Sequence, residues 1–257
     1  MIERHVAVET PDGAMGSFVA HPDTGPRPVV LFLMDAPGKR EELHDMVRRL
    51  ASAGYYVIVS NLYYRSVAEF NVFETGDRDR MFELMNSLTN AMAVDDAKAM
   101  LAYAASDPAA DVSRVGVVGY CMSGPFALMI AAGLPGQVRA AASFHGVRLA
   151  IDAPDSPHRH LGAIAGEIYI GCAETDHWAP PEMVSEFERA LAEAATAGLS
   201  AGLSAGSAAG LPGVSGVVEW YPGTEHGFVF PQRPAYNRDA AERHWSRLHD
   251  LFDRTLR

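Results

Sequence analysis

The sequence has 257 residues, of which 48% are apolar, enough for one large domain or two small ones with a substantial core. This composition excludes a disordered chain, and 32 acidic residues against 21 basic ones give a net charge of −11, which disfavours nucleic acid and anionic membranes as partners. No apolar run reaches the ~20 residues of a bilayer span, and residues 1–5 lack the character of a signal peptide, so we expect a cytoplasmic protein. Cys121 and Cys172 are too few for a disulfide scaffold.

The first part of the chain predicts β-strands that alternate with a helix. A Pro11-Asp12-Gly13 turn between two stretches of alternating apolar residues predicts an N-terminal β-hairpin. The continuous apolar run 29–34 predicts a strand that is buried on both faces, and apolar residues three and four apart within 43–51 predict a helix. A second β-rich run covers 55–59, and a polar stretch without an apolar pattern covers 66–80.

The same alternation continues to the C-terminus. In chain order we predict a helix at 89–105, a strand at 115–118, a helix at 122–132, strands at 140–144 and 167–173, a helix around 183–191, a strand at 217–220 and a helix around 245–252. Strands and helices that alternate on this scale predict an α/β protein with a mostly parallel sheet covered on both faces. In such sheets ligands bind at the C-terminal ends of the strands.

Residues 195–216 break this pattern, because they are almost entirely Ala, Gly, Ser and Leu and contain an immediate repeat. We interpret them as a flexible insertion. Both copies of the repeat match the G-x-S-x-G string of serine hydrolases, around Ser200 and Ser204. We expect no catalytic role for either serine, since neither follows a buried strand and precedes a helix.

Cys121 is the strongest candidate for a nucleophile. It lies in Gly119-Tyr120-Cys121-Met122-Ser123-Gly124, between a predicted strand and a predicted helix, where a serine hydrolase carries its reactive hydroxyl. The sharp turn requires small residues two positions before and after the nucleophile, as Gly119 and Ser123 are. The helix start also favours a thiolate over a thiol. The alternative is a buried structural cysteine at a tight turn.

A thiol nucleophile needs a base and an acid that orients the base, and in this topology both follow it in the chain. Asp176 follows the strand predicted at 167–173, with Glu174 as the competing carboxylate and a local turn-forming role as the alternative. His226 follows the last predicted strand, in a loop whose flanking glycines allow it to bend over the sheet. We therefore expect His226 as the base and Asp176 as its partner.

Together, Gly119-Tyr120-Cys121-Met122, Asp176 and His226-Gly227-Phe228 resemble the dienelactone hydrolase family, whose members open enol-lactones and related esters with a Cys-Asp-His triad. The resemblance covers most of the chain. It implies a single α/β-hydrolase-fold domain over residues 1–257, with a mostly parallel central sheet, helices on both faces and an N-terminal β-hairpin.

The resemblance also assigns roles to these residues. It implies Cys121 as nucleophile, His226 as general base and then general acid, and Asp176 as the residue that orients His226. The backbone N–H groups of Ala36 and Met122 would form the oxyanion hole.

Other positions that align with family residues imply substrate contacts, but several of the residues there differ from those of the family. Asp35 stands where the family has a glutamate that contacts the resting thiol, and because it is one methylene shorter its reach to Cys121 stays open. Arg78 and Phe82 align with the arginine and tyrosine that hold a substrate carboxylate, although Phe82 lacks the hydroxyl and Arg78 could equally be a solvated surface charge. The family's second arginine is replaced by Phe230, and Arg233 is nearby but out of register.

Other histidines carry weaker signals. His145 ends a predicted strand and is a weak candidate for a substrate contact, a hydrogen-bonded histidine at a strand end being the commoner case. His158 and His160 have no cysteine or carboxylate at ligand spacing, so we expect no zinc site. Since no glycine-rich phosphate loop with a following lysine occurs, we expect no cofactor.

The sequence therefore predicts a cysteine-dependent hydrolase of small carboxylic esters or lactones, resembling dienelactone hydrolase. Two alternatives remain: a generic carboxylesterase or thioesterase on the same fold, and a catalytically quiet protein that binds or senses a small molecule through its thiol. The sequence does not predict the oligomeric state.

Overall fold

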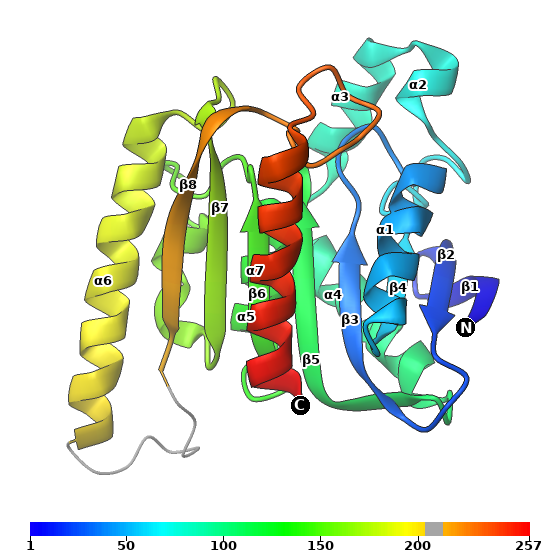
Figure 1. The fold of residues 1–257 in the computed structure, drawn as a ribbon, viewed down its shortest axis with the longest axis horizontal. Helices are drawn as coiled ribbons and strands as arrows, with labels where there is room; N and C mark the ends of the chain where they lie inside the picture. Colours follow the sequence, from blue (N-terminus) through cyan, green and yellow to red (C-terminus); the bar gives the residue numbers. More distant parts are fainter. Residues whose placement is uncertain (204–212) are drawn as a thin grey trace.

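The computed structural model describes residues 1–203 and 213–257, and within them eight strands form one mixed sheet. The strands are β1 (Ile2–Thr10), β2 (Gly13–His21), β3 (Arg27–Leu33), β4 (Tyr56–Ser60), β5 (Ala110–Tyr120), β6 (Val138–Phe144), β7 (Glu167–Thr175) and β8 (Ser215–Glu225). Their spatial order is β1-β2-β4-β3-β5-β6-β7-β8 (Figure 1). The hairpin of β1 and β2 and the pair β2–β4 are antiparallel, and all other pairs are parallel.

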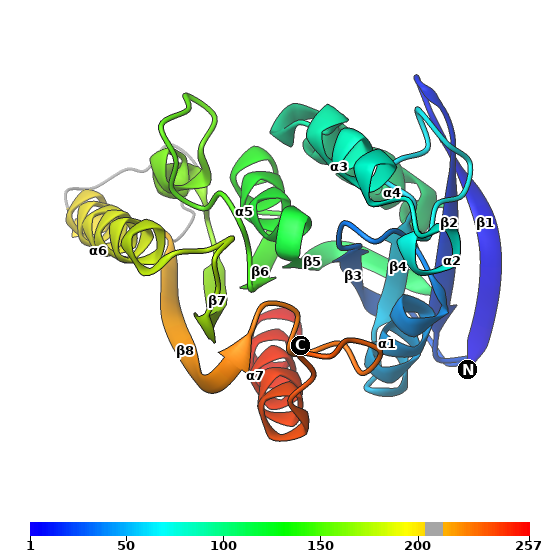
Figure 2. The same cartoon turned by 90° about the horizontal axis from the view of Figure 1, so that it is seen from above.

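Helices cover both faces of this sheet. They are α1 (Glu41–Ser52), α2 (Val72–Thr75), α3 (Arg78–Ser87), α4 (Asn90–Ala105), α5 (Gly124–Gly133), α6 (Pro181–Leu203) and α7 (Arg238–Leu256). Seen from above, α1 and α7 lie on one face, and α4, α5 and α6 lie on the other (Figure 2). None of the helices in the described ranges is long and apolar enough to cross a bilayer.

The predicted fold class, a mostly parallel sheet with helices on both faces, is confirmed. The apolar patterns of the sequence coincide with the residues that each element buries. β4 is buried at every residue, as are the last five residues of β3, which accounts for their continuous apolar runs. The predicted stripe of α1 includes Leu43, Val47 and Leu50, all fully buried. The predicted hairpin is formed by β1 and β2.

The polar stretch 66–80 differs from its prediction, because it contains α2 and the start of α3. The two helices are begun by side-chain caps rather than marked by an apolar stripe. Asn71 Oδ1 accepts from the Phe73 N–H at 3.1 Å, and Asp77 Oδ1 accepts from the Arg80 N–H at 2.9 Å. α3 buries only Met81 and Leu84, so its helical period is hidden in the sequence.

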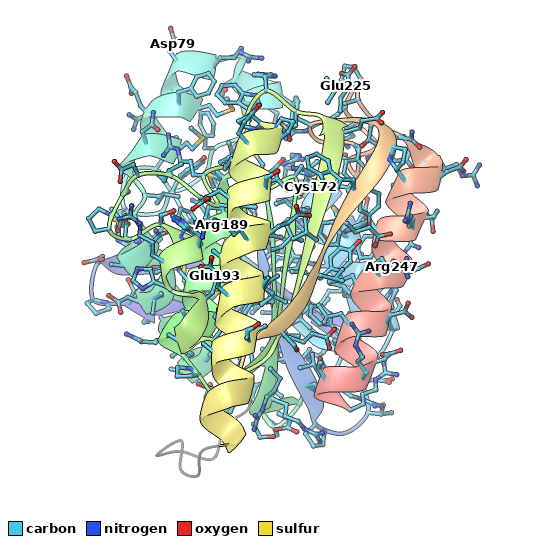
Figure 3. All side chains as sticks on the ribbon, turned by 90° about the vertical axis from the view of Figure 1, so that its left-hand side faces the viewer. Asp79, Cys172, Arg189, Glu193, Glu225 and Arg247 are labelled. Atoms are coloured by element: carbon cyan, nitrogen blue, oxygen red, sulfur yellow. The ribbon has the colours of Figure 1, made fainter. Side chains whose placement is uncertain are left out.

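The stretch 195–216 overlaps two regular elements. α6 continues through it to Leu203, and β8 begins at Ser215. Figure 3 looks onto α6, where Arg189 pairs with Glu193 at 2.5 Å. Ser200 thus belongs to a long helix and not to a strand-to-helix turn, and Ser204 lies outside the described residues.

In Figure 1 the C-terminal ends of the parallel strands point upward, and α2, α3 and the loop after β8 gather above them. This edge of the sheet carries the candidate site, as expected for a parallel α/β sheet.

Candidate active site

Cys121 lies at the tip of a sharp turn between β5 and α5, at the start of a short 3₁₀ helix (Cys121–Ser123). Its φ angle is 55°, in the left-handed region that non-glycine residues rarely adopt. A Cβ at Gly119 would approach the Ser123 carbonyl oxygen to 2.1 Å, so the turn excludes any larger residue there. Ser123 Oγ accepts from the Tyr120 N–H at 2.9 Å and stabilises the turn. The backbone therefore projects a single thiol over the edge of the sheet.

His226 and Asp176 come together from the loops after β8 and β7. His226 Nδ1 lies 2.7 Å from Asp176 Oδ2, and the Asp176 side chain is buried. The other oxygen of Asp176 accepts from the backbone N–H groups of Trp178 at 2.9 Å and Ala179 at 3.2 Å. These bonds fix the carboxylate with one oxygen directed at the imidazole.

Glu174, the competing carboxylate, is exposed, and its Oε2 accepts from the Gly223 N–H at 2.8 Å. It therefore fastens the last residues of β8, just before His226, instead of contacting the imidazole.

The electrostatics of His226 favour the protonated imidazole. Burial lowers the pKa of His226. The Cys121 sulfur and the Asp176 carboxylate outweigh this effect through charge and hydrogen bonding and raise the pKa to about 10. A protonated imidazole between a carboxylate and a sulfur stabilises a thiolate. In contrast, burial raises the pKa of the Cys172 thiol to about 12, so that thiol stays protonated.

Cys121 and His226 open into one cavity of about 330 Å³, here called the Cys121 pocket. Three residues proposed from the sequence as site residues, Ala36, Arg78 and Phe82, also line it. Phe82 packs near Trp178, with ring centroids 5.9 Å apart. The pocket thus brings together residues from the N-terminal and C-terminal halves of the chain.

Ala36 and Met122 are linked by a residue that the sequence analysis did not identify. The buried Tyr63 hydroxyl donates to the Ala36 carbonyl oxygen at 2.9 Å and lies 3.2 Å from Met122 Sδ. Tyr63 follows β4, and no motif or spacing distinguishes it in the sequence.

Asp35 is fully buried and held by two arginines. Arg40 Nη1 donates to Asp35 Oδ1 at 2.5 Å, and Arg233 Nη2 donates to Asp35 Oδ2. Burial alone would raise the pKa of Asp35, but the two guanidinium groups lower it below its ordinary value. Both carboxylate oxygens are thereby occupied by arginine, instead of the thiol contact that the resemblance implies.

The positively charged side chains of the pocket come from one helix and two loops. Arg78 is an exposed residue of α3, and Arg148, after β6, also lines the cavity. Arg233 lines it too, because the loop after His226 folds back, and its guanidinium lies 4.9 Å from the centre of the Phe230 ring. No motif or spacing in the sequence distinguishes Arg148. For Arg233, the only signal was that it lies near Phe230, the position of the family's second arginine.

His145 lies behind His226, outside the wall of the Cys121 pocket. It is fully buried, and the two ring centroids are 4.8 Å apart. Neither of its ring nitrogens has a hydrogen-bond partner among the described residues. Burial and the neighbouring His226 hold the pKa of His145 well below its ordinary value, so its ring is neutral. The structure therefore places His145 as packing against His226.

His158 and His160 are engaged locally: His158 Nδ1 lies 2.8 Å from Ser156 Oγ, and His160 Nε2 lies 3.0 Å from the Pro154 carbonyl oxygen. Across residues 1–203 and 213–257, no three His, Cys, Asp or Glu side chains are grouped to hold a metal ion.

The chain is similar to known proteins in both sequence and structure. It is 27% identical over 248 residues to a putative carboxymethylenebutenolidase of Synechocystis sp., covering 95% of this chain and 93% of the relative. It is 26% identical over 186 residues to a carboxymethylenebutenolidase of Pseudomonas putida, covering 70% and 74%.

Among solved structures, a putative dienelactone hydrolase from Klebsiella pneumoniae superposes with a TM-score of 0.83 at 23% identity, covering 98% of each chain. A model of the dienelactone hydrolase family matches residues 15–200 and 210–256. The chain therefore belongs to the dienelactone hydrolase family, a family of hydrolases, and has the α/β-hydrolase fold.

Proposed function

We propose that this protein hydrolyses small carboxylic esters or lactones through a Cys121-His226-Asp176 triad and an acyl-thioester intermediate. The observation that carries the proposal is the 2.7 Å contact of His226 Nδ1 with Asp176 Oδ2, with His226 facing the same cavity as Cys121. The names of the curated relatives, carboxymethylenebutenolidase, support a lactone or ester substrate.

The reaction follows from these positions. The Cys121 thiolate attacks the carbonyl carbon, a C–S bond forms, and the backbone N–H groups of Met122 and Ala36 stabilise the oxyanion. The C–O bond then breaks, and the leaving oxygen takes a proton from His226 Nε2, the nitrogen that faces away from Asp176. Water, activated by the now neutral His226, attacks the thioester. The acid is released and the Cys121 thiolate is restored.

The arginines of the Cys121 pocket indicate which substrate charge the pocket favours. Although the net charge of −11 repels anions at long range, Arg78, Arg148 and Arg233 line the pocket and favour a substrate that carries a carboxylate. Arg233 is already paired with Asp35, which reduces its availability. This pairing supports the second candidate, a carboxylesterase or thioesterase that also accepts uncharged esters.

The test compares turnover of p-nitrophenyl acetate and of a carboxylated ester by the wild type, Cys121→Ala and Cys172→Ala. We expect Cys121→Ala to lose turnover of both esters and Cys172→Ala, which changes the other buried thiol, to keep it. Full turnover by Cys121→Ala would overturn the proposal. Stable acylation of Cys121 without release would instead indicate a sensing protein.

A further inference from the structure

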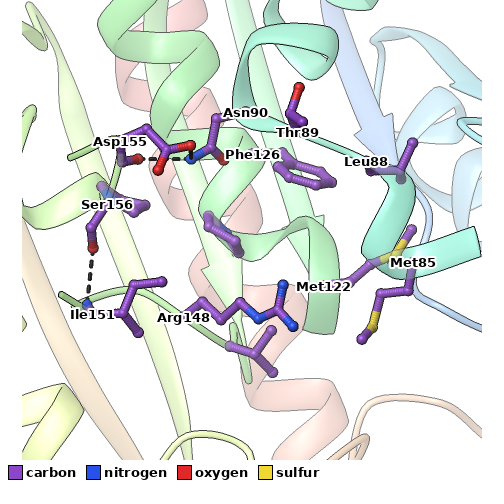
Figure 4. Close-up of a pocket in the computed structure, with 13 residues that line it drawn as sticks. Met85, Leu88, Thr89, Asn90, Met122, Phe126, Arg148, Ile151, Asp155 and Ser156 are labelled. Atoms are coloured by element: carbon purple, nitrogen blue, oxygen red, sulfur yellow. Dashed lines mark hydrogen bonds between the residues drawn. The ribbon is translucent and has the colours of Figure 1, made fainter. Parts of the chain in front are cut away.

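A second cavity of about 170 Å³, here called the side pocket, lies at the N-terminal end of α5 (Figure 4). Its wall includes Met85, Val147 and Arg148, which also line the Cys121 pocket. The two cavities therefore share a boundary.

The deep part of the side pocket is apolar. Met122 and Phe126, 3% and 7% exposed, line it together with the buried Pro125 and Pro157. Covering such a surface with an apolar group is favourable, because apolar area is removed from water.

Several polar groups of the wall, both at its exposed rim and at the buried Ser156, already have hydrogen-bond partners. Asn90 Nδ2 donates to the Asp155 carbonyl oxygen at 2.7 Å and to Asp155 Oδ2 at 3.0 Å. Ser156 Oγ accepts from the Ile151 N–H at 3.0 Å. These bonds, drawn in Figure 4, occupy polar groups that a strongly polar ligand would otherwise use.

The position of the side pocket indicates which part of a substrate would enter it. In the proposed reaction the leaving oxygen lies beside His226, which lines the Cys121 pocket and is absent from the described wall of the side pocket. Met122, whose N–H would stabilise the oxyanion, does line the side pocket. We therefore orient the substrate with its acyl chain directed away from His226, toward the side pocket.

Size and lining point to an aromatic ring. Apolar cavities of roughly 150 Å³ lined by Leu, Ile and Phe bind benzene. The side pocket adds the thioethers of Met85 and Met122 and the guanidinium of Arg148, groups that make favourable contacts with aromatic rings. Figure 4 shows Arg148 extending between Ile151 and these methionines.

We propose that the side pocket binds an aryl group at the end of the acyl chain, so that the preferred substrates are esters of aryl-substituted carboxylic acids. The inference rests on the proposed function for the reaction, whereas binding of the ring requires no turnover.

The experiment compares kcat/KM for p-nitrophenyl 3-phenylpropionate and p-nitrophenyl acetate in the wild type, Ile151→Trp and Val217→Trp. Ile151 lines the side pocket and is 41% exposed, so a tryptophan there fills the pocket with little effect on the core. Val217, 52% exposed on β8, is the matched control.

We expect the wild type and Val217→Trp to favour the aryl ester by about ten-fold or more, as burial of a ring allows. Ile151→Trp should lower that ratio to about one while acetate turnover stays within about two-fold. An unselective wild type, or equal loss of both esters in Ile151→Trp, overturns the proposal.

Calorimetric titration with 3-phenylpropionate and propionate separates this inference from the proposed function, because both ligands carry the same carboxylate. We expect about ten-fold tighter binding of 3-phenylpropionate to the wild type, lost in Ile151→Trp. If neither ester is hydrolysed, the proposed function fails and this binding preference still decides the inference; equal binding of the two acids contradicts it.

Discussion

The hydroxyl of Tyr63 donates a hydrogen bond of 2.9 Å to the backbone carbonyl oxygen of Ala36 and lies 3.2 Å from Met122 Sδ. One buried side chain thus contacts both residues proposed as oxyanion donors. It ties the loop after β3 to the turn that carries Cys121.

Tyr63→Phe should lower kcat about ten-fold with little change in KM, because a displaced donor loses part of the ~3 kcal/mol that one oxyanion contact supplies. Steady-state kinetics checks this positioning role. Tyr64→Phe is the control, since the Tyr64 hydroxyl bonds Asp96 at 3.0 Å and does not contact Ala36. Equal kcat losses in the two variants would show that the Ala36 contact has no special role.

Asp176→Asn should lower kcat by about 10⁴-fold, the effect seen when the acid of a serine triad becomes an amide. An amide can no longer hold His226 Nδ1–H in place or stabilise the imidazolium. Glu174→Gln should keep activity within about three-fold, because Glu174 contacts the Gly223 N–H instead. A greater loss in Glu174→Gln than in Asp176→Asn would reverse the assignment.

Stability should fall as pH rises from about neutral to 10. The pKa of His226 is raised in the folded protein from 6.5 to about 10, so between these values the native state binds more protons than the unfolded state. The stabilisation is therefore complete below 6.5 and lost as pH passes 10. Urea denaturation at several pH values measures this loss, which should be smaller in His226→Gln; an equally steep decline there would assign it to other groups.

Asp35→Ala should destabilise the protein by about 3–5 kcal/mol, because it removes the buried carboxylate that Arg40 and Arg233 share and leaves Arg40 with Glu42 alone. Asp152→Ala, which removes an exposed partner of Arg159, should change stability by less than about 1 kcal/mol. Urea midpoints give both values. Similar losses in the two variants would argue against a buried ion-pair network around Asp35.

Arg78→Ala should raise KM several-fold for carboxylated esters and leave uncharged esters unaffected. Arg78 has no charged partner among the ion pairs of the described residues and lines the Cys121 pocket. Arg80→Ala on the same helix is the control, because Arg80 pairs with Glu83 at 2.9 Å and does not line the pocket. Equal KM changes for charged and uncharged esters would count against a carboxylate contact.

The elements with strong periodicity could be predicted from the sequence. β3, β4 and α1 have their apolar residues where the core requires them, so local pattern and tertiary burial agree. α2 and α3 could not be predicted in this way, because polar caps begin them and they bury few side chains. The end of α6 was also hidden, since a run of Ala, Gly and Ser carries no apolar period.

The sequence by itself determined the order of thiol, acid and imidazole along an alternating α/β chain, because strand ends and their loops follow from local patterns. Only the tertiary structure decided which polar groups meet. Arg233 reaches Asp35 across 198 positions of the chain and Tyr63 reaches Ala36 across 27, contacts that no local pattern encodes. Such pairings arise when loops converge above the sheet, where the burial of one charge or carbonyl requires a partner from elsewhere in the chain.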